Sequence, residues 1–180
     1  MRSRQKVIDA TLDLVAEGGF AAASIAAVAS RAGVSRQTVY SIFGSREDMV
    51  SQAVISVTME ATDEIRSGVD AAEGPAEYLV EFVIAGRAVL HRHPVLATLL
   101  RGEALNPLFD TGMLSRARPV AREMLAPMAV RFPQIESRMD DIVEMALLIG
   151  LSVILFDDPA DRPDDELRAF LTRWIAPSLD

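Results

Sequence analysis

A short stretch of polar and aromatic side chains between residues 35 and 46 is the part of this sequence whose residue types are best suited to binding another molecule. Arg36 and Gln37 offer long hydrogen-bond donors, Thr38 offers a hydroxyl group, and Tyr40 adds an aromatic ring that carries a hydroxyl group. Such groups suit the edges of nucleic-acid bases and the oxygens of phosphates. The same residues would also serve as the solvated face of an ordinary helix, so the elements around them must decide between the two interpretations.

Two short helices are predicted to position these side chains. Ser24 caps a helix over residues 25–32 and Ser35 caps a helix over residues 36–43, because a serine hydroxyl accepts hydrogen bonds from the free N–H groups of a first turn. Both helices are too short to be stable alone. A third helix over residues 3–17 supplies the surface on which they pack, and the three together form a helix-turn-helix.

The turn and the inner faces of the two helices agree with this interpretation. Gly33 ends the first helix, since glycine adopts the left-handed cap conformation without steric cost, and Ala29 is small where the two helices cross. Apolar side chains stand where the motif needs them to face inward, at Val28, Ala32, Val34, Val39 and Ile42. The polar residues that follow Ser35 are therefore expected on the outer face of the second helix.

Four blocks of residues between Arg4 and Val50 add a more specific pattern. They are Ile8-(x)3-Leu12, Glu17-Gly18-Gly19-Phe20, Ala23-Ser24-Ile25-(x)2-Val28-Ala29-(x)2-Ala32-Gly33-Val34-Ser35 and Thr38-Val39-Tyr40-(x)2-Phe43-(x)2-Arg46-Glu47. With them, the stretch resembles the N-terminal domain of the TetR family of bacterial transcriptional repressors. The resemblance implies operator binding by residues 1–46, and a body over residues 47–180 that senses a small molecule and holds a dimer. Gln37 departs from a frequent glycine and Arg46 from the usual lysine of the family.

The residues predicted to contact DNA lie in the first 46 positions: Arg2, Arg4, Ser24, Ser35, Arg36, Gln37, Thr38, Tyr40 and Arg46. We expect Arg36 and Gln37 to read bases, whereas the hydroxyl groups of the same helix and Arg46 anchor phosphates. Arg2 and Arg4 are expected on an N-terminal arm, for which a disordered basic tail is the alternative.

Composition and charge limit the other functions of the chain. Half of the 180 residues are apolar and 24% are charged, as in a folded protein. The net charge is −8, but residues 1–50 hold six basic against five acidic side chains, so the acidity lies in the body. With no cysteine and only His91 and His93, spaced i, i+2 so that they point apart on a helix, we expect neither a metal nor a cofactor.

Catalysis and export find no support in the sequence. A Gly-x-Ser-x-Gly elbow, a glycine-rich phosphate loop and a His-Glu-x-x-His motif are all missing. The basic start is followed by Asp9, Asp13 and Glu17, which a signal peptide would not carry. The longest apolar run, residues 145–156, is too short to span a bilayer. We therefore expect a cytoplasmic protein that is not an enzyme.

The remainder of the chain is also predicted to be helical, which makes the fold all-α. The expected helices cover residues 45–68, 75–92, 113–132, 136–156 and 164–175, with a loop over residues 106–112. The first of these is the candidate that couples the body to the helix-turn-helix, because it continues from one into the other.

The last two helices are predicted to form the dimer. The helix that ends at Phe156 is apolar nearly all round, and such a helix needs to be fully buried. One chain of this size has few elements to cover it, and the TetR family joins its last two helices in an intersubunit four-helix bundle. The predicted interface residues are Leu147, Gly150, Leu151, Ile154, Leu167, Phe170, Leu171 and Trp174.

An effector pocket is predicted beside the C-terminal half of the helix over residues 45–68. Its candidate lining is mostly apolar and flexible, with a few polar groups to orient the ligand: Met59, Phe82, Arg87, Leu99, Glu103, Phe109, Met113, Arg118, Met124, Met128 and Met145. Such a lining suits a hydrophobic or amphipathic molecule. A compact core made of the same residues is the alternative.

Two functions of different classes remain at this point. The first is a dimeric regulator, most simply a repressor, that a small molecule releases from its operator. The second is a helical small-molecule carrier or an enzyme with a vestigial helix-turn-helix. Binding to the DNA upstream of its own gene distinguishes them, and the sequence leaves repressor and activator open.

Overall fold

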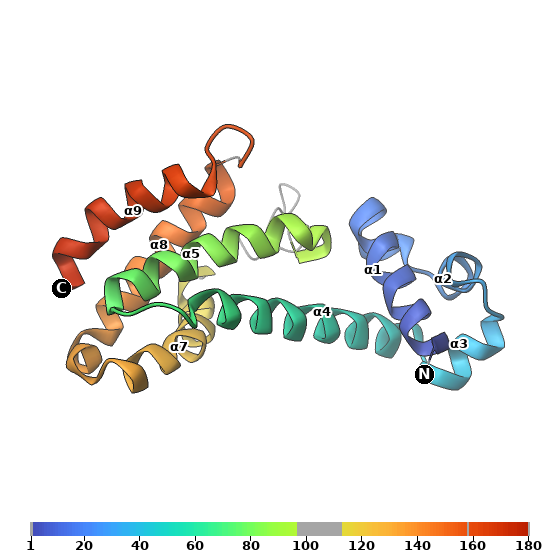
Figure 1. Cartoon of the computed structure of the whole chain (residues 1–180). Coiled ribbons are helices and arrows are strands. Elements are labelled where there is room, and N and C mark those ends of the chain that lie inside the picture. The colour runs from blue at the N-terminus through green and yellow to red at the C-terminus, as the bar shows by residue number, and fades with distance from the viewer. Residues whose placement is uncertain (1, 97–112, 158, 180) are drawn as a thin grey trace. The chain divides into compact units, whose positions relative to one another are not determined.

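The computed structural model describes residues 2–96, 113–157 and 159–179, and it contains no strand in these ranges (Figure 1). The all-helical prediction is confirmed. The elements are α1 (Arg2–Ala22), α2 (Ile25–Ala32), α3 (Arg36–Phe43), α4 (Arg46–Val69), α5 (Pro75–Arg92), α7 (Met113–Arg131), the 3-10 helix η2 (Pro133–Arg138), α8 (Met139–Phe156) and α9 (Asp164–Leu179). The described chain divides into two units, a head (residues 2–61 and 93–96) and a body (residues 62–92 and 113–179).

The head packs α1, α2 and α3 against the first turns of α4 (Figure 1). Its core includes Val7 and Ile8 of α1, Val28 of α2 and Val39 of α3, each at most 1% exposed. Met49 of α4 is also fully buried. The predicted inner faces of the helix-turn-helix are thus confirmed, because its apolar side chains are the ones that water does not reach.

Local capping explains where α2 and α3 begin and end. The side chain of Ser24 accepts a hydrogen bond from the N–H of Ala27, and Ser35 accepts one from Thr38. Gly33 follows α2 in the left-handed conformation at φ 66°, where a side chain would be strained. Both helices have the predicted bounds because these signals lie within a few residues of the helix ends.

The body is built around α5, which packs against both α8 and α9, while α7 packs against α8. Leu79 of α5, Leu125 of α7, Ile142 of α8 and Leu167 of α9 are at most 1% exposed and belong to one core. Four different helices therefore each contribute a fully buried side chain to the core of the body.

Several helix bounds differ from the predictions. In α1, Gly18 and Gly19 are not helical, as expected, but one further turn carries the helix to Ala22. The long apolar helix begins at Met139, because residues 133–138 form the 3-10 helix that starts at Pro133. The last helix extends to Leu179. The predicted loop over residues 106–112 lies outside the described residues.

No helix within the described ranges is long and apolar enough to cross a membrane. In the same ranges, histidine, aspartate and glutamate residues do not gather into groups that would hold a metal ion. His91 lies on α5, where its Nδ1 atom is 3.0 Å from the carbonyl oxygen of Arg87. It therefore makes a local contact with the preceding turn of its own helix.

Candidate nucleic-acid interface and the surface of the body

The outer face of α3 presents a compact set of polar groups to solvent. Arg36, Gln37 and Ser41 are exposed, and Tyr40 is 50% exposed although it is aromatic. Val39 is fully buried on the opposite face. A helix held by its apolar side with hydrogen-bonding groups on the other has the arrangement that a major groove accepts.

The hydroxyl groups at the start of α2 and α3 have local partners. Ser24 Oγ accepts from the N–H of Ala27 at 3.2 Å. Ser35 Oγ accepts from the N–H of Thr38 at 3.0 Å and lies 2.8 Å from Thr38 Oγ1. These serines primarily set the helix starts, so a contact with DNA would use the remaining lone pairs and the free N–H groups beside them.

The expected N-terminal arm is helical from Arg2 onward, which corrects the prediction of an arm. Arg4 donates from a guanidinium nitrogen to Gln52 Oε1 at 2.8 Å, and its guanidinium carbon lies 5.7 Å from the ring centroid of Phe43. Arg4 therefore ties α1 to α4 and to the end of α3. Arg2 is exposed at the first turn of α1.

Arg46 is also placed differently from the prediction. Its Nε atom donates to the carbonyl oxygen of Ala23 at 3.0 Å, and a terminal nitrogen donates to the carbonyl oxygen of Phe20. The other terminal nitrogen is 3.7 Å from Glu47. The predicted phosphate anchor is thus bound to the last turn of α1 and to the connection between α1 and α2.

A third arginine of the head, Arg31, forms a bidentate pair with Glu17 at 2.8 and 2.7 Å. Its hydrogen bond lowers the pKa of the Glu17 carboxyl group. Sequence reasoning missed Glu17, like Gln52, as a partner of an arginine. Because 14 and 48 residues separate the partners, no local pattern identifies them.

The predicted dimer residues of α9 fall into two groups. Leu167 and Leu171 are 0% and 2% exposed, so the structure places them in the core of their own chain and removes them from the predicted interface. Phe170 and Trp174 lie on the outer face of α9 and are 45% and 67% exposed. The helical repeat of apolar residues spans both faces, which is why the sequence did not separate them.

On α8, the predicted residues Leu147, Gly150, Leu151 and Ile154 are half-buried. Leu148 and Phe156 on the same helix are 53% and 84% exposed. A Cβ atom added to Gly150 would have no neighbour within 4 Å among the described residues. At Leu148 and Phe156, α8 therefore presents apolar surface that the described part of the chain leaves uncovered.

Arg87, predicted to orient a ligand, is instead the centre of a buried ionic cluster. Its side chain is fully buried and its terminal nitrogens donate to Asp157 and Asp164, each at 2.5 Å. The carbonyl oxygen of Arg162 accepts a further bond at 3.1 Å, and the Arg162 side chain pairs with Asp157. This corrects the prediction, because Arg87 joins α5 to the connection between α8 and α9.

The other candidate ligand residues are scattered. Met128 is fully buried in the core of the body, and Met59 is 63% exposed in the head. Arg118 forms an exposed pair with Glu144 at 3.0 Å. Phe82, Met124 and Met145 are half-buried in the body. Leu99, Glu103, Phe109 and the side chain of Met113 lie outside the described residues.

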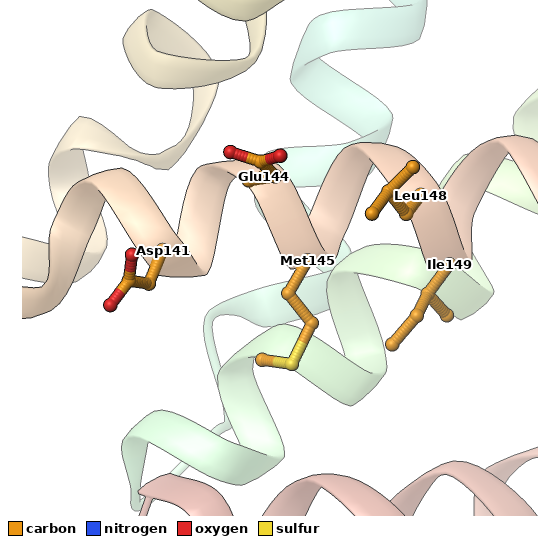
Figure 2. Close-up of a pocket in the computed structure, with 5 residues that line it drawn as sticks. All are labelled: Asp141, Glu144, Met145, Leu148 and Ile149. Atoms are coloured by element: carbon orange, nitrogen blue, oxygen red, sulfur yellow. The ribbon is translucent and has the colours of Figure 1, made fainter.

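Met145 lines a hollow of about 310 Å³ on the surface of α8, together with Asp141, Glu144, Leu148 and Ile149. Figure 2 shows all five side chains leaving this one helix, with Met145 and Ile149 on one side of it in the view and Glu144 and Leu148 on the other. A hollow formed by one helix is open to solvent, so it is a surface feature and does not enclose a ligand.

The chain is similar to known proteins both in its head and along its length. Residues 7–53 match the family described as bacterial regulatory proteins, tetR family. The HTH-type transcriptional regulator AlkX of Mycobacterium tuberculosis is 25% identical over 179 residues, which cover 97% of this chain and 83% of that protein.

Solved structures extend the comparison to the fold. The TetR family repressor AlkX of Dietzia sp. strain DQ12-45-1b, implicated in the biodegradation of n-alkanes, is 27% identical with a TM-score of 0.56, over 96% of this chain and 95% of that one. A TetR-like transcriptional regulator from Rhodococcus sp. RHA1 has a TM-score of 0.64 at 18% identity, over 97% and 96% of the two chains. The second likeness concerns the fold alone.

Proposed function

Because the chain belongs to the tetR family of bacterial regulatory proteins and is a DNA-binding transcriptional regulator, we propose that it is a dimeric repressor which a small apolar or amphipathic molecule releases from its operator. The observation that carries the proposal is the outer face of α3. There, Arg36, Gln37 and Tyr40 are exposed on a short helix whose other face is locked into the core of the head. We assign this face to the major groove of operator DNA.

The proposed division of roles within the interface follows from chemistry. Gln37 presents an amide that makes two hydrogen bonds to adenine, and Arg36 presents donors for guanine or phosphate. Thr38 and Tyr40 anchor phosphates with their hydroxyl groups. Residues 1–46 hold the whole DNA contact, residues 47–180 form the regulatory body, and the protein acts in the cytoplasm, where bacterial DNA lies.

A second copy of the chain is the proposed partner of the body. Leu148 and Phe156 on α8, and Phe170 and Trp174 on α9, expose apolar surface that a dimer interface would cover. Two heads joined in this way would read two half-sites about 34 Å apart or slightly more.

The effector is proposed to be a molecule with a hydrocarbon chain. Support comes from the relationship to the AlkX repressor of Dietzia, which is implicated in n-alkane biodegradation, and from the half-buried apolar side chains of Phe82 and Met124. The ligand must bind the DNA-free form more tightly than the DNA-bound form, since equal affinity for both would shift no equilibrium.

A mobility-shift titration tests the function. The protein should shift a DNA fragment from upstream of its own gene and should not shift an unrelated fragment of equal length. Adding dodecanoate should release the protein from the upstream fragment. Met124→Trp, which enlarges a half-buried side chain of the body, should keep DNA binding and lose the response to dodecanoate. A wild-type protein that binds no upstream fragment more tightly than the unrelated one would refute the proposal and favour a helical carrier.

A further inference from the structure

The basic side chains of the head divide into two groups. Arg4, Arg31 and Arg46 are each held by partners within the head. Within the described part of the chain, the side chains of Arg2, Lys6 and Arg36 are exposed and have neither a hydrogen bond nor an ion pair. Only the second group is immediately available to the phosphates of DNA.

Arg46 is the most completely engaged of the three. Each of its three nitrogens has an oxygen partner, two of them backbone carbonyls of Phe20 and Ala23 and the third the carboxylate of Glu47. A guanidinium group donates its N–H bonds in a fixed planar fork. Turning it toward a phosphate would leave both carbonyl oxygens without this donor.

The positions of these carbonyl groups show which helices the Arg46 side chain joins. Ala23 immediately precedes Ser24, the residue that caps α2, whereas Arg46 is the first residue of α4. The guanidinium thus joins the start of α4 to the start of α2, and α2 in turn carries α3 through the tight turn at Gly33.

We propose that Arg46 is a positioning residue, which holds the α2–α3 pair on α4 and contacts no phosphate. The proposal rests on operator binding by the head. Phosphate neutralisation falls to Arg2, Lys6 and Arg36. Two copies on one operator then use about six basic side chains where twelve are present, so the logarithm of affinity should fall with the logarithm of salt concentration at a slope near −5, and not near −11.

The experiment measures operator affinity between about 50 and about 200 mM potassium chloride for the wild type and four variants. Arg46→Gln and Arg46→Lys should both weaken binding about tenfold at every salt concentration and leave the slope unchanged, since neither reproduces the two-carbonyl fork. Arg36→Gln, the matched control, should reduce the slope by about 1 for each subunit. Arg31→Gln should leave the slope unchanged.

Three results would overturn the proposal: a wild-type slope near −11, an Arg46→Gln slope reduced as much as that of Arg36→Gln, or full affinity in Arg46→Lys. A wild-type slope near −11 would overturn the proposal even if an Arg46 variant fails to fold, which circular dichroism would reveal, and the Arg46→Gln and Arg46→Lys slopes then assign the role of Arg46 itself. If the wild type binds no operator at all, the proposed function fails with the inference, whereas a changed slope in the Arg46 variants contradicts the inference alone.

Discussion

Replacing Arg87 by methionine should destabilise the body strongly, although methionine keeps an unbranched chain as long as the stem of arginine up to Nε. Arg87 is fully buried, and the carboxylate of Asp157 beside it is 8% exposed. Removing one partner of a buried ion pair costs about 3–5 kcal/mol, because the other charge remains in a poorly solvating environment. In this variant Asp157 keeps its pair with Arg162. Asp164 is 51% exposed, so the loss of its pair with Arg87 adds little to the loss of stability.

These contacts place the expected loss at the lower end, about 3 kcal/mol of unfolding free energy. For a chain of this length the loss corresponds to a fall of about 6–12 °C in the unfolding temperature. Thermal and urea unfolding followed by circular dichroism measure it.

Arg118→Met is the matched control. Arg118 and its partner Glu144 are 45% and 55% exposed, and an exposed pair of this kind contributes about 0–1 kcal/mol. If Arg87→Met changed stability no more than Arg118→Met, the assignment of Arg87 to a structural cluster would be refuted, and its predicted role in ligand binding would become attractive again.

Three further predictions concern the two units. Gln37→Ala should relax base preference at one operator position by about 1–3 kcal/mol, whereas Tyr40→Phe should weaken all sequences alike in mobility shifts; the opposite pattern would contradict their roles. Trp174→Glu should leave a folded monomer by light scattering, with dimerisation weakened by about 2 kcal/mol or more, while an unchanged dimer would exclude α9 from the interface. NMR titration should give Glu17 a pKa below its ordinary value of 4.5 that returns toward it in Arg31→Gln. The stability from this pair is present above about pH 4.5, where the unfolded carboxyl is ionised, and is lost as the pH falls through the lowered folded pKa.

The helices of the head followed from local sequence signals. Ser24, Gly33 and Ser35 act on backbone groups within four residues of themselves, so the bounds of α2 and α3 could be predicted without any tertiary contact. The inward faces were equally predictable, because Val28 and Ala32 on α2, and Val39 and Ile42 on α3, recur at helical spacing on one side of each helix. Once the apolar side of α3 is known to face inward, its polar residues must lie on the outer side.

The arginines could not be assigned in this way. The sequence predicted Arg46 to anchor phosphates and Arg87 to bind the ligand, but partners of these side chains lie 23 and 70 residues away. A long charged side chain binds whichever oxygens the folded chain brings near it. Composition and spacing carry no information on that choice.

The apolar helices of the body show the same limit to what the sequence determines. The repeat of Leu167, Phe170, Leu171 and Trp174 on α9 predicts an amphipathic helix correctly, and the structure then buries the two leucines and exposes the two aromatic residues. Periodicity determines only that these side chains form an apolar stripe along the helix. Only the tertiary packing decides which of them are covered within the chain and which face outward, because that depends on where α5 and the other helices lie.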